Sequence, residues 1–86
     1  MTGPLTAEDA HLLGRHLARC GWPPGVVDAT LTGDPDTVTA ATTDTAELAW
    51  HLDLWATARL LAGRPCPAVI DLADRIRTTA EQERTP

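Results

Sequence analysis

The segment formed by residues 45–62 constrains the fold more than any other part of the chain. At 3.6 residues per turn, its apolar side chains form three stripes that together surround nearly the whole circumference of a helix. The stripes are Trp50, Leu54, Ala58 and Leu61; Leu48, Leu52, Trp55 and Ala62; and Ala49, Ala56 and Leu60. A helix that is apolar all round belongs inside a larger assembly of elements. We therefore predict that this segment is the central helix of a bundle.

Capping and breaking residues divide the rest of the chain into further helices. Ala and Leu are abundant while β-branched apolar residues are few, so helix is favoured over strand throughout. The expected fold class is all-α: a small compact bundle of four to five helices in one domain, residues 1–86, with residues 1–5 and 82–86 frayed. Helices are predicted over residues 6–20, 23–32, 37–43, 45–62 and 67–83, with Thr6 and Asp44 as N-caps and Glu47 completing a capping box.

The charge of the chain excludes several classes of protein. It has 86 residues, no lysine and a net charge of −5, which argues against nucleic-acid binding. No apolar run approaches the roughly 20 residues of a membrane span. The first ten residues show no secretory signal, so we expect a cytoplasmic protein with free cysteines. Arginine as the only strong base is typical of GC-rich bacterial coding. Acidic residues concentrate in residues 34–53, where most stand at predicted helix starts.

Two residues four apart, His16 and Cys20, share one face of the first helix and could form half of a metal site. His51 and Cys66 are the residues that could complete it. The spacing is similar to the first half of the His-x3-Cys-x2-Cys motif of zinc-binding anti-sigma factors, but Pro23 stands where the second cysteine is needed. Because zinc sites usually have closely spaced ligand pairs, we expect no metal and no cofactor, with Cys20 packed beside a half-exposed His16.

Cys66 lies between two prolines at a predicted helix N-terminus, where the helix dipole would lower its pKa and favour a nucleophilic thiolate. His51 is the one obvious base for such chemistry. The alternative is a tucked or capping thiol, and this is the interpretation we favour. Since the chain also has no serine, no catalytic residues are assigned and an enzyme is not expected.

Arg59 interrupts the apolar helix near the side of Trp55. A buried charge is costly unless it is paired. We expect an ion pair with Asp71 or Asp74 of the last helix, and an anion-binding arginine is the alternative.

These patterns lead to a small non-enzymatic protein–protein interaction module as the first hypothesis: an adaptor, accessory subunit or regulator. Trp50 and Trp55 point about 140° apart on the helix, so short neighbours cannot easily cover both. We also expect self-association as a homodimer, because a core this small is marginal. The interaction candidates are Trp50, Trp55, Leu54, Leu61 and Trp22.

Two alternatives belong to other classes of protein. The first is a small enzyme or ligand-binding protein with a pocket between the 45–62 and 67–83 helices. Its lining would be Trp50 or Trp55, His51, Arg59 and Cys66. The second, weaker alternative is an acidic mimic of nucleic acid. A cavity where His51, Arg59 and Cys66 converge would favour the pocket, and a flat exposed Trp/Leu patch would favour docking.

Overall fold

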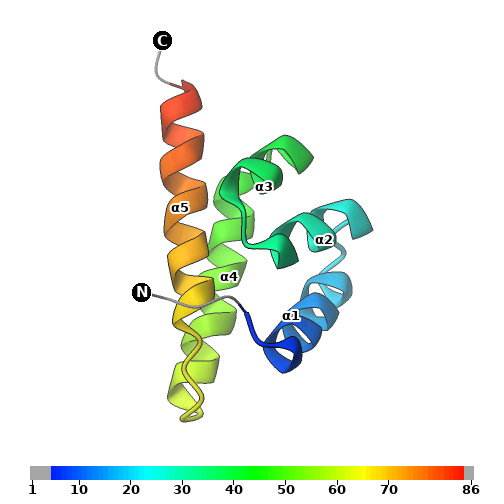
Figure 1. Ribbon diagram of the computed structural model, residues 1–86, viewed down its shortest axis with the longest axis vertical. Coiled ribbons are helices and arrows are strands. Elements are labelled where there is room, and N and C mark those ends of the chain that lie inside the picture. Colours follow the sequence, from blue (N-terminus) through cyan, green and yellow to red (C-terminus); the bar gives the residue numbers. More distant parts are fainter. Residues whose placement is uncertain (1–4, 85–86) are drawn as a thin grey trace.

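The computed structural model describes residues 5–84 and contains five helices, with no strand in that range (Figure 1). The helices are α1 (Ala7–Arg19), α2 (Pro24–Thr32), α3 (Pro35–Ala41), α4 (Thr45–Leu61) and α5 (Pro67–Arg84). The all-α class is confirmed. Of the ends expected to fray, residues 1–4 and 85–86 lie outside the described range. Leu5 packs against the core, and α5 continues to Arg84.

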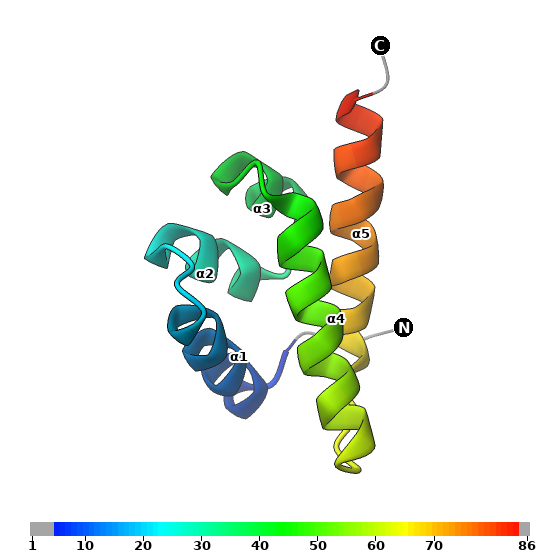
Figure 2. The ribbon, with the colours of Figure 1, turned by 180° about the vertical axis from the view of Figure 1, so that it is seen from behind.

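α4 and α5 form an antiparallel hairpin, and α1, α2 and α3 lie against one side of it (Figures 1 and 2). The hairpin turns just after α4, where Gly63 adopts a left-handed φ of 79°. A residue with a side chain is strained at such an angle, so this glycine ends the helix and reverses the chain. None of the described helices combines the length and the apolar character needed to cross a membrane.

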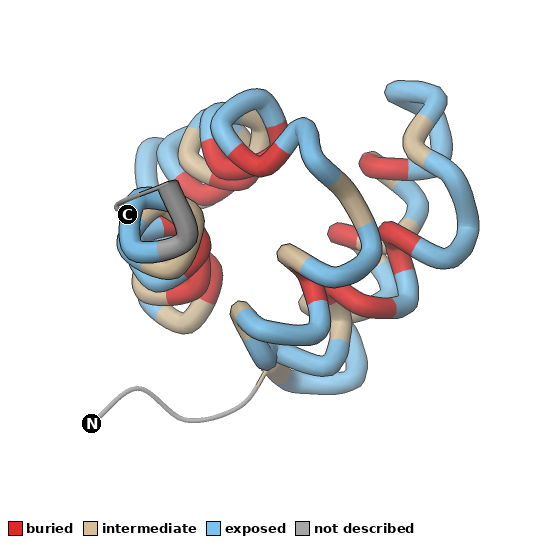
Figure 3. Tube along the Cα trace, turned by 90° about the horizontal axis from the view of Figure 1, so that it is seen from above, coloured by how far each residue is buried: buried red, intermediate tan, exposed pale blue. Residues whose placement is uncertain are grey.

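The core lies between the hairpin and the three shorter helices. Viewed from above, the buried segments of the two groups face one another (Figure 3). Each helix contributes at least one aliphatic side chain to this cluster, and the largest fully buried ones are Leu13, Leu17, Leu48, Leu52, Ile76, Val38 and Val69. The core is therefore continuous across all five helices.

α4 contributes the largest group of buried residues, yet one of its sides is open to solvent. Leu48, Leu52 and Ala56 face the core. On the opposite side, Trp50 is 55% exposed, and the other apolar members of its stripe are exposed as well. Full enclosure of this helix, as its sequence suggests, is not achieved, because the neighbouring helices are too few to cover every side.

Local sequence signals explain most helix boundaries. The Thr6 hydroxyl accepts the Asp9 N–H at 3.1 Å and caps α1, as predicted. The capping box predicted for α4 is wrong: the Asp44 side chain makes no capping bond, and the Asp44 N–H donates to Thr42 Oγ1 at 3.1 Å. α3 begins at Pro35 with Asp34 as its N-cap, because the sequence Asp34-Pro35-Asp36 places a capping residue before a proline that fits the first turn of a helix.

Gly14 allows α1 and α2 to approach closely. A Cβ atom at this position would lie 3.3 Å from Cδ1 of Leu31. That distance is tighter than ordinary van der Waals contact, so the small residue is what fits this crossing.

Candidate functional site

Three ligand-type side chains meet where α1 ends beside α4. His16 lies in the last turn of α1, Cys20 is the C-cap residue of that helix, and His51 belongs to α4. One side-chain atom of each, a ring nitrogen or Sγ, lies within 4.8 Å of the other two. Cys20 Sγ is 3.7 Å from His16 Nε2. The two helices thus bring the His51 imidazole of α4 to a thiol and an imidazole at the end of α1, which are distant from it in sequence.

The Cys20 environment differs from the sequence prediction. We expected this thiol to be packed, and it is exposed beside a half-buried His16. The physical reason is that Leu13 and Leu17 take the core-facing positions of α1. Cys20 is the C-cap residue, past the last turn of that helix, and remains exposed there.

Two indole rings hold the His51 imidazole in place. The Trp22 ring lies edge-on to it with centroids 5.9 Å apart, and the Trp50 ring does so at 5.2 Å. Such edge-to-face contacts each favour one ring orientation. His51 is therefore a constrained side chain, although it stands near the surface.

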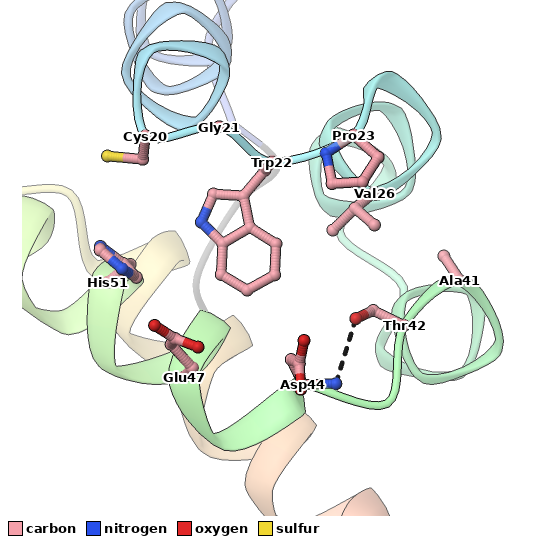
Figure 4. Close-up of a pocket in the computed structure, with 10 residues that line it drawn as sticks. All are labelled: Cys20, Gly21, Trp22, Pro23, Val26, Ala41, Thr42, Asp44, Glu47 and His51. Carbon is pink, nitrogen blue, oxygen red and sulfur yellow. Dashed lines mark hydrogen bonds between the residues drawn. The ribbon is translucent and has the colours of Figure 1, made fainter.

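A cavity of about 320 Å³ opens beside this cluster (Figure 4). Cys20 and Trp22 line it from the α1–α2 connection, and Glu47 and His51 line it from α4. Thr42 and Asp44 close the side nearest α3. The cavity combines apolar walls with a thiol, an imidazole and carboxylates, which is a chemically mixed lining.

A second polar cluster joins the start of α1 to the far end of α4. Arg59 donates to Asp9 Oδ1 at 3.3 Å and lies over the Trp55 ring, 5.5 Å from its centroid. Cys66 Sγ is 3.7 Å from Asp9 Oδ2. The Arg59 Nε atom is buried and has no hydrogen-bond partner among the described residues. The partly buried Asp9 carboxylate therefore interacts with both Arg59 and Cys66.

The predicted partner of Arg59 is wrong. Asp71 pairs with Arg75 on the same helix at 3.0 Å, and Asp74 pairs with Arg77. Both acids lie on the outward part of α5, where an arginine one turn along is the nearest cation. Asp9 is closer to Arg59 because α1 starts beside the end of α4. The expectation of an ion pair between helices holds, with a different acid.

The predicted activation of Cys66 is also wrong. The residue is buried. Burial raises the pKa of its thiol, and the neighbouring Asp9 carboxylate raises that pKa further. The Val69 N–H acts in the opposite direction, as expected at a helix start, but is outweighed. Cys66 is a protonated, tucked thiol, which was the interpretation favoured from the sequence.

The pocket predicted from His51, Arg59 and Cys66 is not formed by the described residues. His51 and Arg59 are eight positions apart on α4, which places them about 12 Å apart along the helix axis. His51 belongs to the cluster with Cys20, whereas Arg59 and Cys66 belong to the cluster with Asp9. The proposed lining is thus divided between two separate places.

The predicted interaction residues also divide into two groups. Trp50, Leu54 and Leu61 are 55%, 48% and 83% exposed, and they follow one side of α4. We call these three residues the α4 stripe. Trp22 and Trp55, in contrast, are partly buried and pack against the core.

Sequence reasoning missed the roles of two residues. From the sequence, Asp9 is only an acid in the first turn of the first helix, where the helix dipole favours negative charge, and Glu47 is only part of a capping box. Their positions beside Arg59 and in the cavity depend on how α1 and α2 pack against α4, which no local pattern specifies.

Comparisons of this chain with protein-family models, with curated protein sequences and with solved structures return no match.

Proposed function

We propose that this protein is a small non-enzymatic interaction module and that the α4 stripe is its docking surface. One observation carries the proposal: three large apolar side chains lie exposed on one side of a well-packed helix. Exposed tryptophan and leucine gathered on one surface are typical of interface anchors.

The position of the stripe on α4 supports docking by a second helix. The stripe lies on the side opposite Leu48 and Leu52, which face the core. It extends from Trp50 to Leu61, about 16 Å along the helix axis. An elongated apolar surface of this kind suits another helix lying along it.

A second copy of the chain is the occupant that the pattern favours. In an antiparallel pairing that sets Trp50 of one copy against Leu61 of the other, Leu54 meets Thr57, so a large side chain faces a small one. The same pairing brings Glu47 toward the turn that follows α4 of the second copy, and this turn carries Arg64. Both residues are exposed, and their charges are opposite. The surface is thus self-complementary, as a two-fold interface requires.

Sedimentation of the full chain tests the proposal, in reducing buffer with a chelator so that neither a disulfide nor a metal ion links the chains. We expect a dimer at high-micromolar concentration. Leu61→Glu places a charge in the stripe and weakens the dimer at least about tenfold, a loss of roughly 1.4 kcal/mol. Leu60→Glu is the matched control, because Leu60 is 54% exposed on the same helix but lies outside the stripe.

Two outcomes would overturn the proposal. One is a wild-type protein that stays monomeric at high-micromolar concentration. The other is equal weakening of the dimer by Leu61→Glu and Leu60→Glu, which would indicate that a general gain of charge, rather than the stripe, controls association.

A further inference from the structure

We propose that His16, Cys20 and His51 form a binding site for a divalent transition-metal ion of the Zn²⁺ type, joining α1 to α4. The three ligands lie outside the α4 stripe, which touches the site only through the contact of Trp50 with His51. The proposal departs from the sequence prediction that no metal is bound.

The spacing of the three ligand atoms supports coordination. Zinc lies about 2.0–2.3 Å from nitrogen and sulfur ligands, so ligands of a tetrahedral site stand roughly 3.3–3.6 Å from one another. The Cys20 Sγ to His16 Nε2 distance of 3.7 Å is already near that range. The full set, within 4.8 Å, requires the remaining pairs of atoms to close by about 1.5 Å at most.

The side chains can make this adjustment without disturbing the core. Cys20 is exposed and His16 is half-buried, so rotation about their side-chain bonds meets little resistance. His51 is already held between Trp22 and Trp50. One fixed ligand and two adjustable ligands thus converge on a single point.

The ligand types indicate which metal ion fits. A thiolate with two imidazoles suits zinc and related transition metals, whereas magnesium and calcium prefer oxygen ligands. Three protein ligands leave a fourth tetrahedral position for a water molecule. The cavity of about 320 Å³ beside Cys20 and His51 has room for that water (Figure 4).

A metal ion at this site would also cross-link α1 to α4 and so stabilise the fold. The closest helix–helix packing of α1 is with α2, and that of α4 is with α5. A metal ion held by α1 and α4 together would connect two elements that approach each other less closely. We therefore expect metal binding to raise the unfolding temperature of the protein.

Titration of the metal-free, reduced full chain with Zn²⁺ and Co²⁺ tests the inference. We expect one ion per chain, a thiolate-to-cobalt charge-transfer band, and a change in tryptophan emission because His51 contacts Trp22 and Trp50. Removing a residue that hydrogen-bonds to a metal ligand typically weakens metal binding by about 10–100-fold. Removing a ligand itself, in Cys20→Ser or His51→Gln, should therefore weaken binding at least about 100-fold.

Two variants serve as matched controls. His11→Gln removes an exposed histidine of the same helix, α1, and Cys66→Ser removes the other thiol. Both should bind Zn²⁺ with wild-type affinity. Cys20 is exposed, so Cys20→Ser tests the site even if His51→Gln disturbs folding.

Three results would overturn the inference. The first is a wild-type chain that takes up no Zn²⁺ at equimolar concentrations in the micromolar range. The second is unchanged binding in Cys20→Ser. The third is a loss of the cobalt charge-transfer band in Cys66→Ser with its retention in Cys20→Ser.

Discussion

The two cysteines show how strongly position in the fold controls a residue. Cys20 is exposed beside two histidines, and Cys66 is buried beside a carboxylate. The sequence favours a tucked Cys66, which the structure confirms, whereas the packed Cys20 that it predicts is exposed. At the scale of the residue, burial and the charge of Asp9 outweigh the favourable helix terminus at Cys66.

The raised pKa of Cys66 predicts a loss of stability in alkali. The ordinary pKa of a cysteine thiol is 9.0, and the raised pKa of Cys66 means that its thiol keeps its proton above this pH in the folded state. The unfolded state therefore releases the proton first. This contribution to stability is complete below about pH 9 and is lost as pH rises through the folded pKa.

Urea unfolding at about pH 8 and pH 10 measures this effect. Wild type should lose more stability between the two pH values than Cys66→Ala does. Cys20→Ser should retain the wild-type loss, because Cys66 is still present. Parallel losses in wild type and Cys66→Ala would contradict the assignment.

Neutralising Asp9 should destabilise the protein. Asp9→Asn leaves Arg59 partly buried without its acid, and hydrogen bonds to charged groups typically contribute about 1.5–3 kcal/mol. We expect a decrease of about 1–3 kcal/mol in the free energy of unfolding, measured in urea. Glu8→Gln is the control, since Glu8 is an exposed acid of the same helix turn and should change stability by less than about 0.5 kcal/mol. Equal effects would mean that only the helix dipole is involved.

The candidate metal site could be predicted from sequence only in part. The i, i+4 spacing of His16 and Cys20 is local and places both on one helix face. The identity of the third ligand depends on how α1 packs against α4. The sequence alone offers both His51 and Cys66 as candidates for it. The partner of Arg59 was unpredictable for the same reason. Long-range pairs depend on packing, for which the sequence carries no comparably short pattern.

At the scale of the element, helix starts differ in how much their N-cap residues contribute. The Thr6 hydroxyl caps α1, whereas the Asp44 side chain makes no capping bond at α4. Asp34 caps α3, where the Thr37 hydroxyl donates to its carboxylate at 2.6 Å and lowers the pKa of Asp34. Sequence patterns identify such residues correctly as helix starts but do not say which side chains bond.

This difference predicts unequal effects of two alanine substitutions. Thr6→Ala should decrease the free energy of unfolding by about 0.5–2 kcal/mol, the usual range for a lost N-cap. Asp44→Ala should change it by less than about 0.5 kcal/mol, because no bond is lost. Thermal or urea unfolding of both variants measures the contrast. A larger loss in Asp44→Ala would mean that its carboxylate caps α4 in solution.

The helices themselves were largely predictable, because their limits depend on nearby residues. Pro67 opens α5 and glycines follow α1, α2 and α4 at or close to the predicted ends. The surroundings of α4 were not predictable. An apolar pattern on all sides shows that burial would be favourable, but it does not say how many neighbours are present to provide it.

At the scale of the whole molecule, stability depends on a small number of fully buried aliphatic residues. Domains of this size are marginally stable, at about 5–15 kcal/mol or less. A single cavity in this core therefore removes a large share of the total. Exposed apolar residues, such as those on the open side of α4, do not contribute to the stability of a single chain in this way.

Leu52 and Leu54 provide a direct comparison on α4. Leu52 is fully buried and Leu54 is 48% exposed. Leu52→Ala should decrease the free energy of unfolding by about 2–5 kcal/mol. Leu54→Ala should change it by less than about 0.5 kcal/mol at concentrations low enough to keep the protein monomeric. Circular dichroism in urea measures both values. Equal losses would place Leu54 in the core and remove the basis for the α4 stripe.

The closest helix packing follows an almost linear order, from α1 to α2, α2 to α3, α3 to α5 and α5 to α4. The α1–α4 seam closes this order into a ring, and both polar clusters lie along it. Regions held by fewer close contacts open first in the native state. Transient opening of the molecule should therefore begin at this seam, where it would separate Asp9 from Arg59 and expose the Cys66 thiol before the α4–α5 hairpin unfolds.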